Sequence, residues 1–463
     1  MQVARVLMVC LCLLTLVACG GGSSNAVNPP ATQGVAQLSL SLRDMPPMGV
    51  TVLSFQATVT GVAMQPGNVS LLNSPMTLEM TQLQTMAVYL GTISVPAGNY
   101  TGMMITFANP RMTFLNNSGG MMMMGPANCA NGEICVFSPP MMSSSVTISG
   151  SPFPLNVQAN MPLSMQMDFD VMNSMQSNLS INPSMTSMMQ QPMQGSNAFD
   201  EMDDMVGRVG SVNAANNQFT MQFVQGPPSM TIGVDTNTMF EDFDTIPAAN
   251  SLAGMAAGQI IEVNMQLMSG GTLHATRVRF ENRNATELEG MIVAINSLTQ
   301  ADMIVTNMAP AVQGVNIGDV VRMNLQAGAS FDIDDHDMPV SGMSFAGASD
   351  LMVGQVVQME PMSAPSTGTP PQVNVNHVRL MKAWFTAKVA SKIDASTFTV
   401  NNLPGLFATA GVNSVKVMTS SGTEFKDVSG VAALSVGDTI SLRGPMFMAS
   451  GNPTLIASKV QKR

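Results

Sequence analysis

The sequence predicts an all-β protein built of several domains. Apolar and polar residues alternate with period two from Val35 onward, and no long amphipathic helical pattern is present. The chain holds 39 Gly and 28 Pro in 463 residues, and these residues punctuate the alternating segments as turns. The length exceeds that of one ordinary domain, so we expect about three or four.

Residues 1–18 have the pattern of an export signal. Arg5 is the only charge, an apolar run extends from Val6 to Val17, and Ala18 and Cys19 follow. The run is shorter than the roughly 20 residues that a membrane-spanning helix needs, and its layout is typical of a secretory signal. An ordinary signal peptide with a chance cysteine at the cut is the alternative.

Leu16-Val17-Ala18-Cys19 resembles the lipobox of bacterial lipoproteins. The resemblance implies cleavage before Cys19 and lipid on its sulfur, so that a membrane is the first partner. Residues 19–34 are then a flexible tether, rich in Gly, Ser, Asn and Pro. Gly20 rather than Asp after the cysteine favours a Gram-negative outer membrane, facing either the periplasm or the surface.

The remaining cysteines fit an exported chain. Cys10 and Cys12 would leave with the signal, whereas Cys129 and Cys135 stay in the segment N-C-A-N-G-E-I-C. In an oxidising compartment we expect them to form a disulfide. Metal binding by this pair is the alternative, although no third thiol or imidazole lies nearby in the sequence.

Composition excludes some functions. The formal net charge is −11, and an acidic surface repels phosphate backbones, so we expect no nucleic-acid partner. One Trp and two Tyr argue against an aromatic stacking platform for sugars. Most of the 47 Met are read as core residues.

Three groups of methionines lie outside any strand pattern, at residues 121–124, 141–142 and 161–205, and the first is the candidate ligand cluster. It consists of Met121, Met122, Met123 and Met124. Thioethers are soft ligands, so the cluster is a candidate Cu(I) or Ag(I) site. A surface that takes up oxidant as methionine sulfoxide is the alternative.

Residues 35–182 are predicted to form the first folded domain. The segment Ser39–Pro47, the turn V-P-A-G-N-Y-T and the strand M-D-F-D at Met167–Asp170 resemble domain-of-unknown-function family 4382. The resemblance implies an Ig-like or transthyretin-like sandwich, grouped with carbohydrate-binding-like folds, and implies no activity. Arg43 departs from the usual Thr, and residues 116–145 read as an insertion.

Two shorter segments complete this part of the chain. Residues 81–89 are compatible with a short helix. Residues 183–204 are rich in Met, Ser and Gln and contain Pro, so they are predicted to form a linker.

Three copies of one pattern follow, at residues 205–283, 286–382 and 384–463. Each copy has a hairpin, an extended segment ending in an acidic turn, a glycine corner and a last strand. The corner residues are Gly258, Gly354 and Gly437, where we expect a positive φ or a close backbone approach. Copies of this length suit a small closed barrel without exposed edges. They resemble domain-of-unknown-function family 5666, which implies OB-like barrels.

The densest group of candidate ligands is acidic. Asp332, Asp334, Asp335 and Asp337 surround His336 and offer hard oxygen ligands for Ca²⁺. The spacing is not that of an EF-hand, because Asp337 replaces the required Gly and Met343 replaces the closing Glu. A solvated acidic loop is the interpretation that we favour.

Catalytic motifs are missing from the sequence. His274 and His377 fall on predicted terminal strands, and no nucleophile elbow, phosphate loop, zinc spacing or haem motif occurs. We therefore expect a non-enzymatic lipoprotein of the cell envelope, without a cofactor, that binds a polysaccharide or a protein or serves as a surface structure. A soft-metal or Ca²⁺-binding exported protein is the second hypothesis, and a carboxylate-dependent hydrolase is the third.

Overall fold

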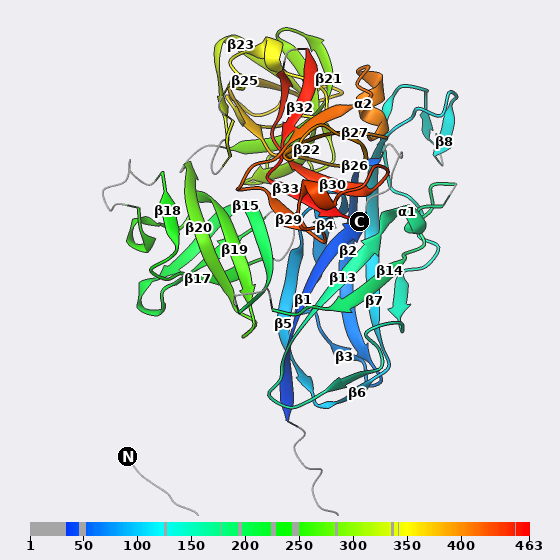
Figure 1. The fold of residues 1–463 in the computed structure, drawn as a ribbon, viewed down its shortest axis with the longest axis vertical. Coiled ribbons are helices and arrows are strands. Elements are labelled where there is room, and N and C mark those ends of the chain that lie inside the picture. The colour runs from blue at the N-terminus through cyan, green and yellow to red at the C-terminus, as the bar shows by residue number, and fades with distance from the viewer. Residues whose placement is uncertain are drawn as a thin grey trace, which may run out of the picture. The chain divides into compact units, whose positions relative to one another are not determined.

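The computed structural model describes residues 34–45, 52–124, 127–176, 178–192, 197–223, 228–242, 250–282, 286–334, 338–340, 342–449 and 451–463. These residues are mostly β-strand, which confirms the predicted all-β class (Figure 1). Residues 34–463 form one compact unit. The predicted signal, Cys19 and most of the tether lie outside the described residues.

The described residues between 35 and 189 form two large sheets and two small two-stranded sheets, β12-β6 and β8-β9. One large sheet has the order β14-β13-β1-β5 and the other β10-β7-β2-β3, with β11 added to β7 and β4 to β2. Their strands are β1 (Val35–Met45), β2 (Val52–Gln65), β3 (Val69–Ser70), β4 (Met76–Glu79), β5 (Val88–Pro96), β7 (Gly102–Leu115), β10 (Ile134–Phe137), β11 (Ser145–Ile148), β13 (Pro162–Asp170) and β14 (Met185–Met189). Smaller elements are η1 (Met80–Gln84), β6 (Gly98–Tyr100), β8 (Met122–Met124), β9 (Ala127–Cys129), β12 (Leu155–Val157) and α1 (Val171–Ser174).

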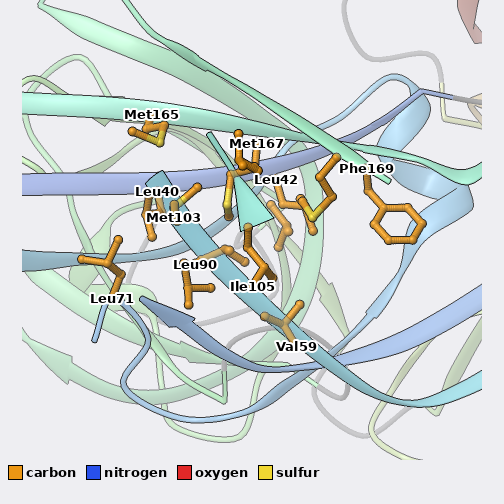
Figure 2. Close-up of a cluster of buried hydrophobic side chains, with 14 of the residues drawn as sticks. Leu40, Leu42, Val59, Leu71, Leu90, Met103, Ile105, Met165, Met167 and Phe169 are labelled. Atoms are coloured by element: carbon orange, nitrogen blue, oxygen red, sulfur yellow. The ribbon is translucent and has the colours of Figure 1, made fainter. Parts of the chain in front are cut away.

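The two large sheets bury one apolar core between them, and we call this part the sandwich (Figure 2). Leu38, Leu40 and Leu42 enter the core from alternate positions of β1, as the period-two pattern predicts. Methionines fill much of the rest: Met165 and Met167 on β13 are wholly buried. Methionine therefore serves here as an ordinary core residue.

Three boundaries differ from the sequence-based prediction. The linker is shorter than residues 183–204, because β14 pairs with β13 inside the sandwich and the next strand already begins at Ala198. The insertion at residues 116–145 is not wholly outside the fold, since β10 pairs with β7. The short helix expected at residues 81–89 is a single 3-10 turn, η1.

Each of the three copies forms a ring of strands, and we call them repeats 1, 2 and 3. Repeat 1 contains β15 (Ala198–Asn213), η2 (Ala214–Asn216), β16 (Gln218–Gln222), β17 (Met230–Gly233), β18 (Met239–Glu241), η3 (Leu252–Gly254), β19 (Ile260–Met268) and β20 (Leu273–Asn282). Repeat 2 contains β21 (Glu287–Ser297), β22 (Gln300–Ala309), β23 (Val320–Ile333), η4 (Ala348–Asp350), β24 (Val356–Pro361) and β25 (Gln372–Met381). Repeat 3 contains β26 (Ala383–Lys392), β27 (Thr397–Asn401), α2 (Gly405–Thr409), β28 (Val415–Met418), β29 (Glu424–Lys426), η5 (Val431–Ala433), β30 (Thr439–Gly444), β31 (Met446–Ala449), β32 (Asn452–Ile456) and β33 (Lys459–Lys462).

The order of pairing is the same in all three rings. Repeat 2 is a closed barrel of order β21-β22-β23-β25-β24. Repeat 1 has the order β15-β16-β17-β20-β19, and repeat 3 has β26-β27-β28, then β32 and β33, then β30. In each ring the third strand runs parallel to the last strand. Closure removes exposed edges, as expected for a small barrel.

The sandwich is joined to repeat 2 by hydrogen bonds to one loop. Arg111 and Thr113 on β7 donate to the carbonyl oxygens of Ile317 and Gly318, each over 2.6 Å. Arg111 also forms an ion pair with Asp319. The domains are therefore packed against one another within the compact unit, and are not a loose string of modules.

Candidate functional site

The three corner glycines have a structural role. Gly258, Gly354 and Gly437 have φ values of +90°, +91° and +92°, a region that side chains with a Cβ rarely occupy. The amide of each donates to a carbonyl on the first strand of its own repeat, over 2.8 to 2.9 Å. The prediction of a positive φ at this station is confirmed.

The acidic turn of each repeat lies beside that repeat's last strand. Glu241 faces Arg277 at 4.0 Å, Asp332 faces His377 at 3.2 Å, and Glu424 faces Lys459 at 2.8 Å. In each case the acidic residue is on a short parallel strand segment. The recurring acidic residue therefore pairs with a base of the same repeat.

The Asp332–His377 pair perturbs both groups. The hydrogen bond to Asp332 raises the pKa of His377. Although its partial burial acts in the opposite direction, the contacts with His377 and Arg379 lower the pKa of Asp332. Both shifts favour the charged forms of the pair.

The predicted calcium ligands do not converge on one point within the described residues. Asp332 contacts Arg379 and His377, whereas Asp334 contacts Arg279 of repeat 1 at 2.5 Å. Asp335 and Asp337 lie outside the described residues. Across the part of the chain that the structure describes, no group of three or more His, Cys, Asp or Glu side chains is placed to hold a metal ion. Calcium binding stays an untested prediction.

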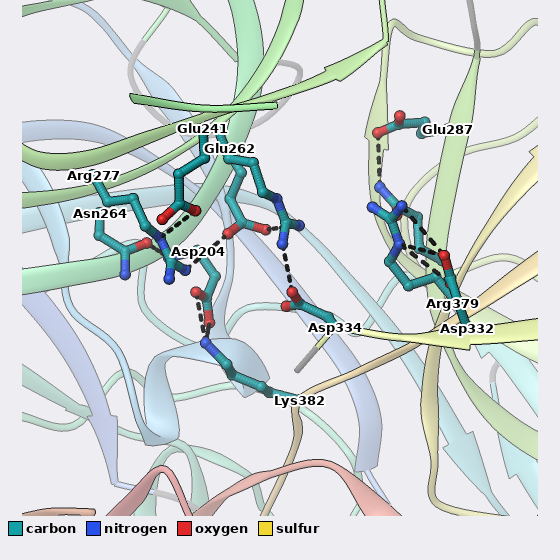
Figure 3. Close-up of polar contacts among 12 residues, drawn as sticks. Asp204, Glu241, Glu262, Asn264, Arg277, Glu287, Asp332, Asp334, Arg379 and Lys382 are labelled. Atoms are coloured by element: carbon teal, nitrogen blue, oxygen red, sulfur yellow. Dashed lines mark hydrogen bonds and ion pairs between the residues drawn. The ribbon is translucent and has the colours of Figure 1, made fainter. Parts of the chain in front are cut away.

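A buried charge network connects the three repeats; Figure 3 shows its contacts between repeat 1, Asp334 of repeat 2 and Lys382. Asp204 of repeat 1 accepts from Lys382, between repeats 2 and 3, at 2.9 Å, and from Arg443 of repeat 3 at 2.8 Å. Although burial opposes ionisation, these two cations hold the pKa of Asp204 well below its usual range. Arg279 links Glu262, at 3.2 Å, to Asp334 of repeat 2.

The sequence reasoning missed this network. Its members are ordinary charged residues that lie far apart in the chain, and no spacing connects them. The only local signal is that Lys382 stands at the predicted boundary between two copies. Removing either partner of such a buried pair leaves a charge without compensation, so the network is suited to fixing the repeats relative to one another.

A groove of about 770 Å³ lies between the sandwich and repeat 1. The repeat contributes the turn between its first two strands, with Asn216 and Asn217, and the turn between its last two, with Gly271 and Thr272, followed by His274 at the start of β20. Amide and hydroxyl side chains from both parts line it, together with the imidazole of His274: Asn73, Ser74, Tyr89, Thr92, Asn216, Asn217, Gln218, Ser229, Thr231 and Thr272. Among the described residues that line it there is no Asp, Glu, Lys or Arg.

The floor of this groove is held by a contact between the two parts. The hydroxyl of Tyr89 donates to Thr92 over 2.7 Å, and the hydroxyl of Thr92 donates to the carbonyl of Gly271 over 2.9 Å. Gly271 has a φ of +77°, and a Cβ there would lie 2.6 Å from the Thr92 methyl carbon. Only glycine allows this approach.

The cysteine pair and the methionine cluster share one hairpin region. Cys129 and Cys135 form a disulfide with a Cα–Cα distance of 6.0 Å, as predicted. Met121 and Met123 are 65% and 74% exposed, whereas Met122 packs toward the cluster of Phe114 and Cys129. The side chain of Met124 lies outside the described residues. Of the three methionines whose side chains are described, two are therefore exposed and one packs inward, and soft-metal binding stays a prediction.

No helix among the described residues is long and apolar enough to cross a membrane.

Comparison with protein families agrees with this layout. Residues 35–185 match the model of the family "Domain of unknown function (DUF4382)". Residues 206–279 and 387–461 match the model of the family "Domain of unknown function (DUF5666)". No curated protein matches the chain. Residues 35–185 are therefore a DUF4382 domain, and residues 206–279 and 387–461 are two DUF5666 domains, with the structurally equivalent repeat 2 between them.

Proposed function

We propose that the protein is a lipid-anchored, non-enzymatic binding protein of the cell envelope, and that the groove between the sandwich and repeat 1 binds a neutral polysaccharide chain. The observation that carries the proposal is the lining of the groove. Amides and hydroxyls form hydrogen bonds with sugar hydroxyls, and the absence of charged side chains from its described lining suits an uncharged ligand in a chain of net charge −11.

The position of the groove on repeat 1 supports the same ligand class. We infer that the repeats are OB-like, because five strands close in the order first, second, third, fifth, fourth. OB-folds bind oligosaccharides and oligonucleotides at the loops joining strands 1 and 2 and strands 4 and 5. The groove uses the equivalent two turns of repeat 1, and the acidic net charge disfavours an oligonucleotide.

Co-sedimentation of the detergent-solubilised full chain with insoluble neutral polysaccharides tests the proposal. Gln218→Ala removes an amide from the groove, and Gln222→Ala changes an exposed glutamine on the same strand, β16, outside the groove. We expect Gln218→Ala to weaken binding about threefold or more and Gln222→Ala to leave it unchanged. Equal binding by both variants, or no binding by the wild-type chain, contradicts the proposal.

The anchor has its own test. A fatty-acid label should be incorporated by the wild-type chain and by Cys12→Ser, but not by Cys19→Ser. Because Cys12 lies in the apolar run of the same signal, it is the matched control. Labelling of Cys19→Ser would contradict lipidation at that residue.

Soft-metal binding is the second candidate. Met121 and Met123 are exposed residues two positions apart around β8, and such residues lie on one face of a strand. After loading with Cu(I), elemental analysis should find copper in the wild-type chain and less copper in Met121→Leu/Met123→Leu. An unchanged copper content in that variant would exclude this pair.

A further inference from the structure

A second cavity, of about 90 Å³, lies where the sandwich and all three repeats meet. Most of its lining is apolar, and two aromatic residues, Phe223 and Trp384, belong to it. Trp384 is the only tryptophan of the chain. The cavity is distinct from the polar groove, which is lined by other residues of the sandwich and repeat 1.

Three carboxyl groups line this cavity, and the first is already saturated. Glu79 accepts from the Ser54 hydroxyl at 2.6 Å, the Phe55 amide at 2.9 Å, and the amide and hydroxyl of Thr81 at 3.2 and 2.8 Å. These four donors satisfy its carboxylate oxygens.

The second carboxyl group is Asp204, which is paired with two cations. Lys382 and Arg443 both contact it within 3.0 Å. Arg443 also lines the cavity. Its guanidinium group already forms an ion pair with Asp204.

The third carboxyl group is Glu289 on β21, and no described residue forms an ion pair with it. Arg443 is the largest influence that favours its ionised form, and the Asn307 side chain hydrogen-bonds to it. Asp204 and Asp334 oppose ionisation. Burial raises the pKa of Glu289 to about 7. Of the three carboxyl groups that line the cavity, Glu289 is therefore the one without a saturating set of donors and without an ion pair among the described residues.

We propose that the central cavity binds a small alkylammonium cation, with Glu289 as its counter-ion. Glu289 is partly shielded from water. A carboxylate in such surroundings is more stable when it is paired or protonated, and an ammonium group inside the cavity would supply the pair. Apolar and aromatic walls suit the alkyl groups of such a cation. Alkaline-earth ions, in contrast, require six to eight oxygen ligands, and the described lining offers few besides the carboxyl groups already named.

Titration of the full chain with methylammonium or ethylammonium chloride tests this site. We expect a saturable change of Trp384 fluorescence at pH 8, and calorimetry should report the same dissociation constant. Because a proton competes for Glu289, the affinity should fall about 30-fold at pH 5.5. Potassium chloride at equal ionic strength should not reproduce the change.

Two variants, together with the pH dependence of binding by the wild-type chain, test the site. Glu289→Gln should abolish saturable binding, whereas Glu201→Gln, at a partly buried carboxyl outside the cavity, should retain it. The pH dependence of the wild-type chain gives an answer even if Glu289→Gln folds poorly. The proposal is overturned if calorimetry of the wild-type chain at pH 8 detects no binding, if potassium binds equally well, or if Glu289→Gln binds normally.

Discussion

Replacing Glu289 with Gln should stabilise the protein at alkaline pH. Glu289 is the carboxyl group at the four-part junction that no described residue pairs with, and burial raises its pKa from 4.5 to about 7. The folded protein therefore holds a proton that the unfolded chain releases. The contribution of Glu289 to the free energy of unfolding is fully present below pH 4.5 and is lost as the pH rises toward 7.

The size of this loss of folding stability follows from the pKa shift of Glu289. One pKa unit corresponds to about 1.4 kcal/mol, so a shift from 4.5 to about 7 corresponds to about 3 kcal/mol at pH 8. Glutamine keeps the shape and cannot ionise. We therefore expect Glu289→Gln to exceed the wild-type protein by up to about 3 kcal/mol at pH 8 and to match it near pH 4.

Urea unfolding followed by Trp384 fluorescence, in buffers free of alkylammonium ions, measures this difference. Glu133→Gln is the control, since Glu133 is exposed, and its effect should stay within about 0.5 kcal/mol at both pH values. The reasoning fails if Glu289→Gln gives no stabilisation at pH 8, or if its stabilisation is larger at pH 4 than at pH 8.

Three further predictions concern other buried groups. Asp44→Asn should raise the melting temperature at pH 8 and not at pH 4, because burial and the neighbouring Asp168 hold the pKa of Asp44 well above its usual value. An unchanged melting temperature at pH 8 would contradict this. Arg279→Met should cost about 3 to 5 kcal/mol in urea unfolding, since it leaves the buried Asp334 without its cation and Glu262 with Arg277 alone, at 3.6 Å. A cost below about 1 kcal/mol would mean that the network is not stabilising. Gly354→Ala should destabilise the protein more than Gly437→Ala in the same assay. A Cβ at Gly354 would lie 2.5 Å from Phe407, whereas a Cβ at Gly437 meets nothing within 4 Å. Equal effects of the two variants would show that backbone strain alone determines the loss of stability.

Local patterns were sufficient to predict much of the fold. Alternation over short segments predicted the strands, and the recurring corner predicted three equivalent copies, because a positive φ restricts the residue at one position. The disulfide of Cys129 and Cys135 followed from compartment and proximity in sequence. Each of these inferences needs information from only a few neighbouring residues.

Strand β14 shows why the linker was misjudged. Met185 and Ser187 are buried and the residues after each are exposed, so the segment does alternate. Serine and methionine carry a weak hydrophobic contrast, and the following Gln and Pro residues suggested a loop. The pairing with β13, which decides the structure, is not a property of the segment itself.

Long-range partners could not be predicted. Asp204 and Lys382 are far apart in sequence and meet only because three rings pack together. The acidic turns were interpreted as solvated loops for the same reason: their partners are on last strands that come later in each copy. The grooves and cavities formed between domains share this limit, since no single segment contains them.

Repeat 2 keeps the backbone features of the other two repeats without matching the family model. It has the same strand order and the same glycine corner as its neighbours, yet the family model matches only repeats 1 and 3. Its surface is engaged on several sides: Asp334 contacts Arg279 of repeat 1, and the loop at Gly318 receives Thr113 of the sandwich. One of these contacts uses a carboxylate and the other a backbone carbonyl, so repeat 2 packs against its neighbours while its backbone keeps the strand order and the glycine corner of repeats 1 and 3.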